Sequence, residues 1–120
     1  MALLNYIGGN SSSGTDAGLV ETGITAAGTT QATATRLRAQ NSDVGTVTSG
    51  TGVILSEFLP MMVGVEQTVF NSGANPLKVY PPSGMQINAL TTNAAITLGL
   101  NTGILFRSVS STRVFGILSA

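Results

Sequence analysis

The stretch VGVEQTVFNSGANPLKVYPPSG, residues 63 to 84, sets the fold class that we expect. Its first part places valine at positions 63, 65 and 69, opposite Glu66, Thr68 and Phe70. Such a two-residue alternation is typical of a half-buried β-strand. NSGAN (71–75) is rich in residues that tolerate a positive φ, so it predicts a hairpin turn that leads into a second strand, PLKVY (76–80). PPSG (81–84) predicts the next turn.

Strand-like runs continue on both sides of this stretch. TQATATRLRAQ (30–40) alternates small residues and suits a strand of low bulk, while GVILSEF (52–58) is a β-branched run that Leu59 and Pro60 separate from the next strand. Met85 and Ile87 are expected to point inward, and AAITLGL, GILFRS and TRVFGIL follow. Turn signals recur about every 8 to 12 residues, which indicates an all-β fold, an antiparallel β-sandwich or barrel.

The N-terminal part has a different composition. GGNSSSGTDAG, residues 8 to 18, reads as a linker, and the bulky apolar residues before it are Leu3, Leu4, Tyr6 and Ile7. We therefore expect an extended flexible arm over residues 1–25 and a single β domain over residues 26–120. The apolar tip is either a frayed terminus or an arm that docks on a neighbouring subunit.

Composition limits the classes of function. Of 120 residues, 8% are charged and 42% are hydrophobic, and five basic residues balance five acidic ones. This balance argues against a nucleic-acid-binding surface or a polybasic membrane-binding segment. A neutral, charge-poor surface is poorly suited to a free monomer, so we expect other subunits to cover much of it. The start of the chain resembles neither a secretory signal nor a spanning helix, and we expect folding in a cytoplasm.

The residues offer little for catalysis. Lys78 follows Gly73 without the spacing or the Ser/Thr of a phosphate-binding loop, so it is expected to be a solubilising charge on an edge strand. The chain has no His and no Cys, which removes the common triads and thiol dyads. Glu57 and Glu66 flank the Leu59–Pro60 corner and could approach one another, but a carbohydrate cleft is not expected in so small a chain. We therefore expect that the protein is not an enzyme and that it has no catalytic residue, no cofactor and no metal site.

A family resemblance adds a location. GTTQATATRL (28–37), GTGVIL (50–55), VFNSGANPLKVYPPSGMQIN (69–88), AAITLGL and FRSVSSTRVF (106–115) together resemble a module of tailed-bacteriophage virion structural proteins. The resemblance covers about three quarters of the chain. It departs from the family pattern where SEF follows GVIL, and where Phe115 stands in place of a Trp. The module occurs in capsid decoration (cement) proteins and in head and tail fibres, and the short chain favours the head.

The resemblance implies a decoration protein that binds the outer surface of the major capsid protein lattice and stabilises the head. Its expected location is the virion, after assembly in the bacterial host cytoplasm, and its expected state is a homotrimer, with a dimer as the alternative. Leu3, Leu4, Tyr6 and Ile7 of the arm are the predicted contacts with the capsid or another partner. A head- or tail-fibre module that binds a host surface glycan is the alternative function, for which Tyr6 and Tyr80 could stack on sugars.

Overall fold

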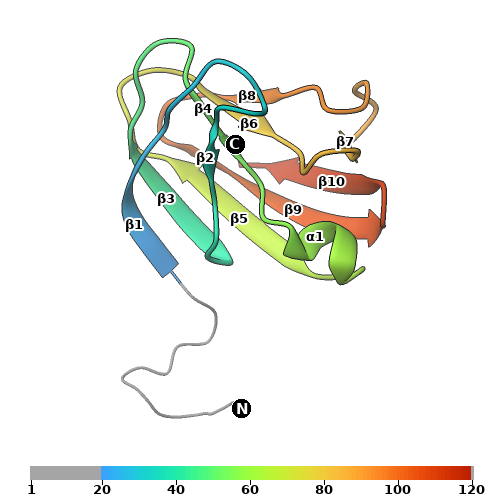
Figure 1. Cartoon of the computed structure of the whole chain (residues 1–120). Coiled ribbons are helices and arrows are strands. Elements are labelled where there is room, and N and C mark those ends of the chain that lie inside the picture. Colours follow the sequence, from blue (N-terminus) through green and yellow to red (C-terminus); the bar gives the residue numbers. More distant parts are fainter. Residues whose placement is uncertain (1–19, 120) are drawn as a thin grey trace.

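The computed structural model describes residues 20 to 119, which form two β-sheets packed face to face (Figure 1). The six-stranded sheet runs in the order β1 (Val20–Thr25), β3 (Asn41–Thr46), β5 (Glu66–Asn71), β9 (Thr102–Ser110), β10 (Arg113–Leu118) and β7 (Gln86–Ile87). The four-stranded sheet runs β2 (Thr35–Arg36), β4 (Gly52–Ile54), β6 (Leu77–Tyr80) and β8 (Ile96–Leu98). The predicted all-β sandwich is confirmed.

The strand pairing differs from the expected antiparallel one. From β1 to β6 the chain alternates between the sheets, so that β1, β3 and β5 are parallel neighbours, as are β2, β4 and β6. Each coil thus supplies one strand to each sheet, as in a β-solenoid. Between the strands of residues 20–119, antiparallel pairing occurs where β8 joins β6 and where β9 joins β5 and β10. Both sheets are therefore mixed.

The NSGAN segment is not a hairpin turn. It carries the chain from β5 in one sheet to β6 in the other, and the buried Asn71 side chain holds it. Its amide Nδ2 donates to the carbonyls of Leu98 (3.1 Å) and Asn75 (3.0 Å), while its Oδ1 accepts from the Gly73 N–H (2.9 Å). A turn composition therefore predicted a change of direction, but not that the change would take the chain to the other sheet.

The core lies between the sheets. The inward positions of β5 and β9 hold Val69, Ile104 and Phe106, all at most 1% exposed. Facing them in the four-stranded sheet are buried apolar side chains of β4, β6 and β8, namely Val53, Leu77, Val79 and Leu98. The alternation predicted for residues 63–71 is confirmed at the buried Val69 and the outward Phe70, but Val63, predicted to share the face of Val69, precedes β5 and is exposed. Met85 and Ile87 are buried as predicted.

The β domain begins earlier than predicted. The sequence predicts an arm over residues 1–25, but residues 20–25 form β1 and pair with β3, with Ile24 buried in the core. This segment consists mostly of small and polar residues, and Ile24 is its one buried apolar residue, so its composition does not indicate a strand. The remainder of the predicted arm, including Leu3, Leu4, Tyr6 and Ile7, lies outside the described residues.

Two further segments differ from their predictions. The corner at Leu59 and Pro60 is a one-turn helix, α1 (Phe58–Met61), where proline is tolerated because the first turn of a helix needs no partner for its N–H groups. In the predicted strand 30–40, only Thr35 and Arg36 form β2. Residues 30–34 form a turn instead, in which the Ala34 N–H donates to the Thr30 carbonyl (3.0 Å).

Candidate functional site

An open groove of about 790 Å³ lies on the outer face of the six-stranded sheet. We call it the sheet groove. Its apolar walls include Phe70, Leu105, Ile117 and Leu118, and Val20 lines it at the side of β1. Ile117 is 67% exposed and Phe70 is 44% exposed, which is unusual for large apolar side chains gathered in one place.

Strand alternation and register bring these side chains together. Leu105 on β9 is the cross-strand partner of Thr68 on β5 and of Ile117 on β10, so the three share the outer face. Phe70 is paired with Gly103, and the absence of a side chain at Gly103 lets the ring lie across β9. The central apolar part of the groove is therefore built by three consecutive strands of the sheet, β5, β9 and β10.

The groove has a polar rim and a charged neighbour. On the side of β3, the Ser72 hydroxyl donates to the Asp43 carboxylate, and both residues line the groove. Farther along the same face, Glu66 and Arg107 form an ion pair between cross-strand partners. These groups bound an apolar surface with hydrogen-bonding groups at its margin, which is the usual composition of a protein-binding patch.

A second apolar surface protrudes beside α1. Met61, Met62 and Val63 are consecutive and exposed, with Met61 at 79%, and we call them the α1 knob. The knob is held firmly: Leu59 is fully buried, its carbonyl accepts from the Ser108 hydroxyl (2.6 Å), and the Gly64 N–H donates to the Ser108 carbonyl (2.8 Å). An apolar protrusion of this kind is preformed and does not have to become ordered when it binds.

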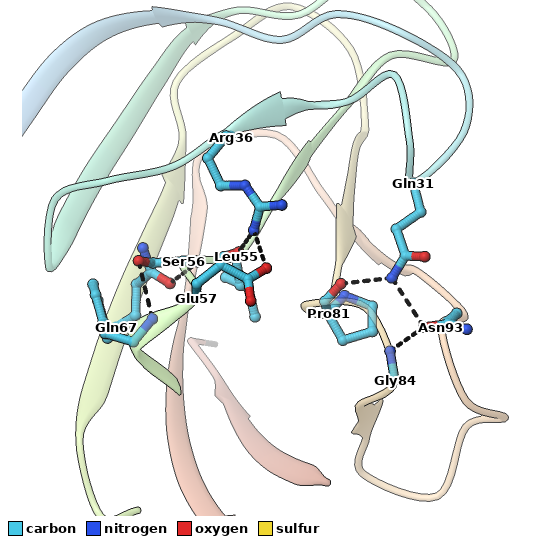
Figure 2. Close-up of polar contacts among 10 residues, drawn as sticks. Gln31, Arg36, Leu55, Ser56, Glu57, Gln67, Pro81, Gly84 and Asn93 are labelled. Carbon is cyan, nitrogen blue, oxygen red and sulfur yellow. Dashed lines mark hydrogen bonds and ion pairs between the residues drawn. The ribbon is translucent and has the colours of Figure 1, made fainter. Parts of the chain in front are cut away.

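A polar hollow of about 340 Å³ lies over the four-stranded sheet. Figure 2 shows its main polar groups: Arg36 donates to the Leu55 carbonyl and to Glu57, and Gln31 donates to the Pro81 carbonyl and to Asn93. Ala32, Ala34, Ile54 and Ser83 complete the lining. The charges of Arg36 and Glu57 neutralise one another, so the hollow offers hydrogen bonds without a strong net field.

The buried polar side chains form hydrogen bonds that join separate segments of the chain. The Gln67 Oε1 accepts from the Ser56 N–H and its Nε2 donates to the Ala39 carbonyl, both at 2.9 Å. Asn71 and Ser108 are likewise bonded to backbone groups of other segments. Because these bonds join segments far apart in the sequence, the buried amides and hydroxyl are explained by the fold.

Several residues singled out in the sequence can now be placed. Lys78 is outward-facing between the buried Leu77 and Val79, but β6 is an inner strand of its sheet and not an edge. Glu57 and Glu66 occupy separate ion pairs, with Arg36 and Arg107 respectively.

Tyr80 is 8% exposed and its hydroxyl donates to the Thr29 carbonyl (3.0 Å), so it presents no face to a sugar. The predicted contacts of the arm lie outside the described residues.

The sheet groove was not found from the sequence. The outward position of Phe70 was a usable signal, and TRVFGIL holds apolar residues at alternate and adjacent positions. The sequence does not show that β5, β9 and β10 are neighbours in one sheet, and the groove depends on that arrangement.

Comparison of the chain with models of protein families, with curated proteins and with solved structures finds no significant match. Within residues 20–119, no group of three or more carboxylate side chains is arranged to hold a metal ion. In the same region, the helix that is present is too short to cross a bilayer.

Proposed function

We propose that the protein is a bacteriophage capsid decoration protein that binds the outer surface of the major capsid protein lattice and stabilises the head. The virion location rests on the sequence resemblance described above. The homotrimer predicted with it, or a dimer, belongs to the same proposal.

One observation supports the general part of the proposal, namely that other protein subunits cover much of this protein's surface in an assembly. Among residues 20–119, eleven large hydrophobic side chains are exposed, whereas the same region contains only nine charged residues. Two arginines and two glutamates of the nine neutralise each other in ion pairs. Such a surface gains free energy when other protein surfaces cover it, at roughly 25 cal/mol for each Å² of apolar area buried.

We assign the α1 knob as the capsid contact within the described region. Its three side chains protrude on a firmly bonded turn, and the two methionines can adapt to an irregular surface. A single knob is small and binds weakly. Copies linked in an oligomer would raise the effective concentration of each next contact, so that the whole assembly stays bound.

The test is to measure copy number in purified particles, by mass spectrometry against the major shell protein. A ratio near one, or a simple fraction of one, is expected for a decoration protein on the lattice. A handful of copies would place the chain at a tail or a vertex and contradict the proposal, and complete absence would contradict the virion assignment.

The alternative, a fibre module that binds a host glycan, has one feature in its favour. The polar hollow combines uncharged hydrogen-bonding groups such as Gln31 and Ser83 with small apolar residues. Measurable affinity for host polysaccharide, lost in Gln31→Ala, together with a low copy number, would favour this function over decoration.

A further inference from the structure

The sheet groove leaves apolar side chains in contact with water, and a segment of this chain is suited to cover them. We propose that residues 3 to 7, in the free protein, dock in the sheet groove of their own chain. The inference concerns an interaction within one molecule, and it stands whether or not the protein decorates a capsid.

The shape of the surface favours a segment over a second copy of the sheet. The groove is hollowed, with walls from β1, β5, β9 and β10. Two copies of a hollow placed face to face would leave space between them, and close packing is what makes burial favourable. Its volume of about 790 Å³ lies within the range of pockets that hold compact ligands or short peptide segments.

The chemistry of the segment matches that of the groove. Leu3, Leu4, Tyr6 and Ile7 are bulky and apolar, whereas residues 8 to 18 include no bulky apolar residue. The tyrosine hydroxyl needs a hydrogen-bond partner when its ring is buried, and the rim offers Asp43 and Ser72. The match therefore covers both the apolar walls and the polar margin.

The dimensions also agree. Five residues in an extended conformation span roughly 17 Å. The distance from β1 to β10 across the sheet is four strand spacings, or roughly 19 Å. A segment of this length can cross the groove from one wall to the other.

The connection to the domain makes docking within one chain favourable. Val20, the first described residue, itself lines the groove. The twelve residues from 8 to 19 are rich in Gly and Ser, and a tether of this kind has an average span of roughly 20 Å. A short tether holds its end at an effective concentration in the millimolar range, so a contact with a dissociation constant well below that range would be mostly formed.

Contact with a capsid would use the same four apolar side chains. Docking in the groove and binding of the arm to a capsid are therefore mutually exclusive, and the groove would hold the arm in the free protein only.

The test uses the full chain, which has no cysteine. A nitroxide is attached to the single cysteine of Asn5→Cys, and paramagnetic broadening of backbone amide signals is measured in the ¹⁵N-labelled protein. Broadening is expected to be much stronger at Phe70, Leu105 and Ile117 than at Lys78 or Thr97 on the other sheet, because the effect falls steeply with distance and the two sheets are stacked roughly 10 Å apart. Broadening spread evenly over both sheets, or none in the groove, would overturn the proposal.

Two comparisons sharpen the result. In Ile117→Ser or Phe70→Ser the broadening in the groove should fall several-fold, while Met61→Ser, which removes an even more exposed apolar side chain outside the groove, should leave it unchanged. The dispersion of the same spectra reports whether each variant is folded. Finally, ¹⁵N-labelled chain without nitroxide is mixed with unlabelled chain that carries it. Groove broadening that persists in this mixture would assign the groove to a neighbouring chain and overturn docking within one molecule.

Discussion

The ring of Phe70 on β5 lies across Gly103 on β9, so close that a Cβ at Gly103 would come within 2.7 Å of the ring Cδ1. The pair joins two neighbouring strands on the outer face and forms part of the wall of the sheet groove. Because the pair lies at the surface, its position determines how much a substitution at Gly103 should lower the free energy of unfolding.

Gly103→Ala is expected to cost less than about 1 kcal/mol in the free energy of unfolding, because the half-exposed ring of Phe70 can swing aside. Gly73→Ala is the contrasting change. There a Cβ would meet the side chain of Val47 at 2.6 Å and its backbone nitrogen at 3.0 Å, so a cost of about 1 to 3 kcal/mol is expected. Urea unfolding followed by circular dichroism measures both, and equal costs would contradict the distinction.

Asn71→Ala is expected to destabilise the protein by about 2 to 3 kcal/mol, because it leaves buried backbone groups around the crossing from β5 to β6 without partners. The control is Thr97→Ala on the exposed side of β8, with an expected change within about 0.5 kcal/mol. If the two variants unfold at the same urea concentration, the Asn71 side chain does not brace the crossing.

Gln67→Met conserves the size of the side chain but removes its bonds to the Ser56 N–H and the Ala39 carbonyl. A loss of about 1 to 3 kcal/mol is expected, together with faster hydrogen exchange at Ser56. Gln86→Met is the matched control, since Gln86 is only half-buried and water can replace its bonds. Unchanged exchange at Ser56 would show that Gln67 does not anchor the segment before α1.

The paired substitution Met61→Ser and Met62→Ser should reduce binding to capsids that lack the protein by at least tenfold, because it removes the two exposed methionine side chains of the α1 knob. The fold should be unaffected, since Leu59 supplies the buried anchor. Leu90→Ser and Leu100→Ser together are the control for exposed apolar residues elsewhere. Binding assays by co-sedimentation measure the effect, and equal losses in both pairs would argue against the knob as the contact.

Deletion of residues 2 to 9 tests the contacts predicted for the arm. We expect this deletion to abolish capsid binding and to leave the fold intact, with the thermal unfolding midpoint lowered by no more than about a few degrees because the arm no longer docks in the sheet groove. Binding that is unchanged after the deletion would remove Leu3, Leu4, Tyr6 and Ile7 from the capsid contacts. A large drop in the midpoint would show instead that these residues contribute to the fold.

The two-residue alternation by itself determined much of the sandwich. It placed Val69 and Phe70 on opposite faces, and it identified Met85 and Ile87 as inward. This works because a strand turns successive side chains to opposite faces, whatever its neighbours are. Composition likewise indicated a surface with few charges.

Only the tertiary structure decided which strands are neighbours. A turn sequence such as NSGAN is compatible with a hairpin or with a crossing between sheets, and the choice depends on buried contacts of Asn71 with Leu98 and Gly99, distant in the sequence. The parallel coils and the sheet groove follow from that choice, because Phe70, Leu105 and Ile117 meet only once β5, β9 and β10 lie side by side. Local pattern fixes the face of a residue, whereas its partners depend on the packing of the whole chain.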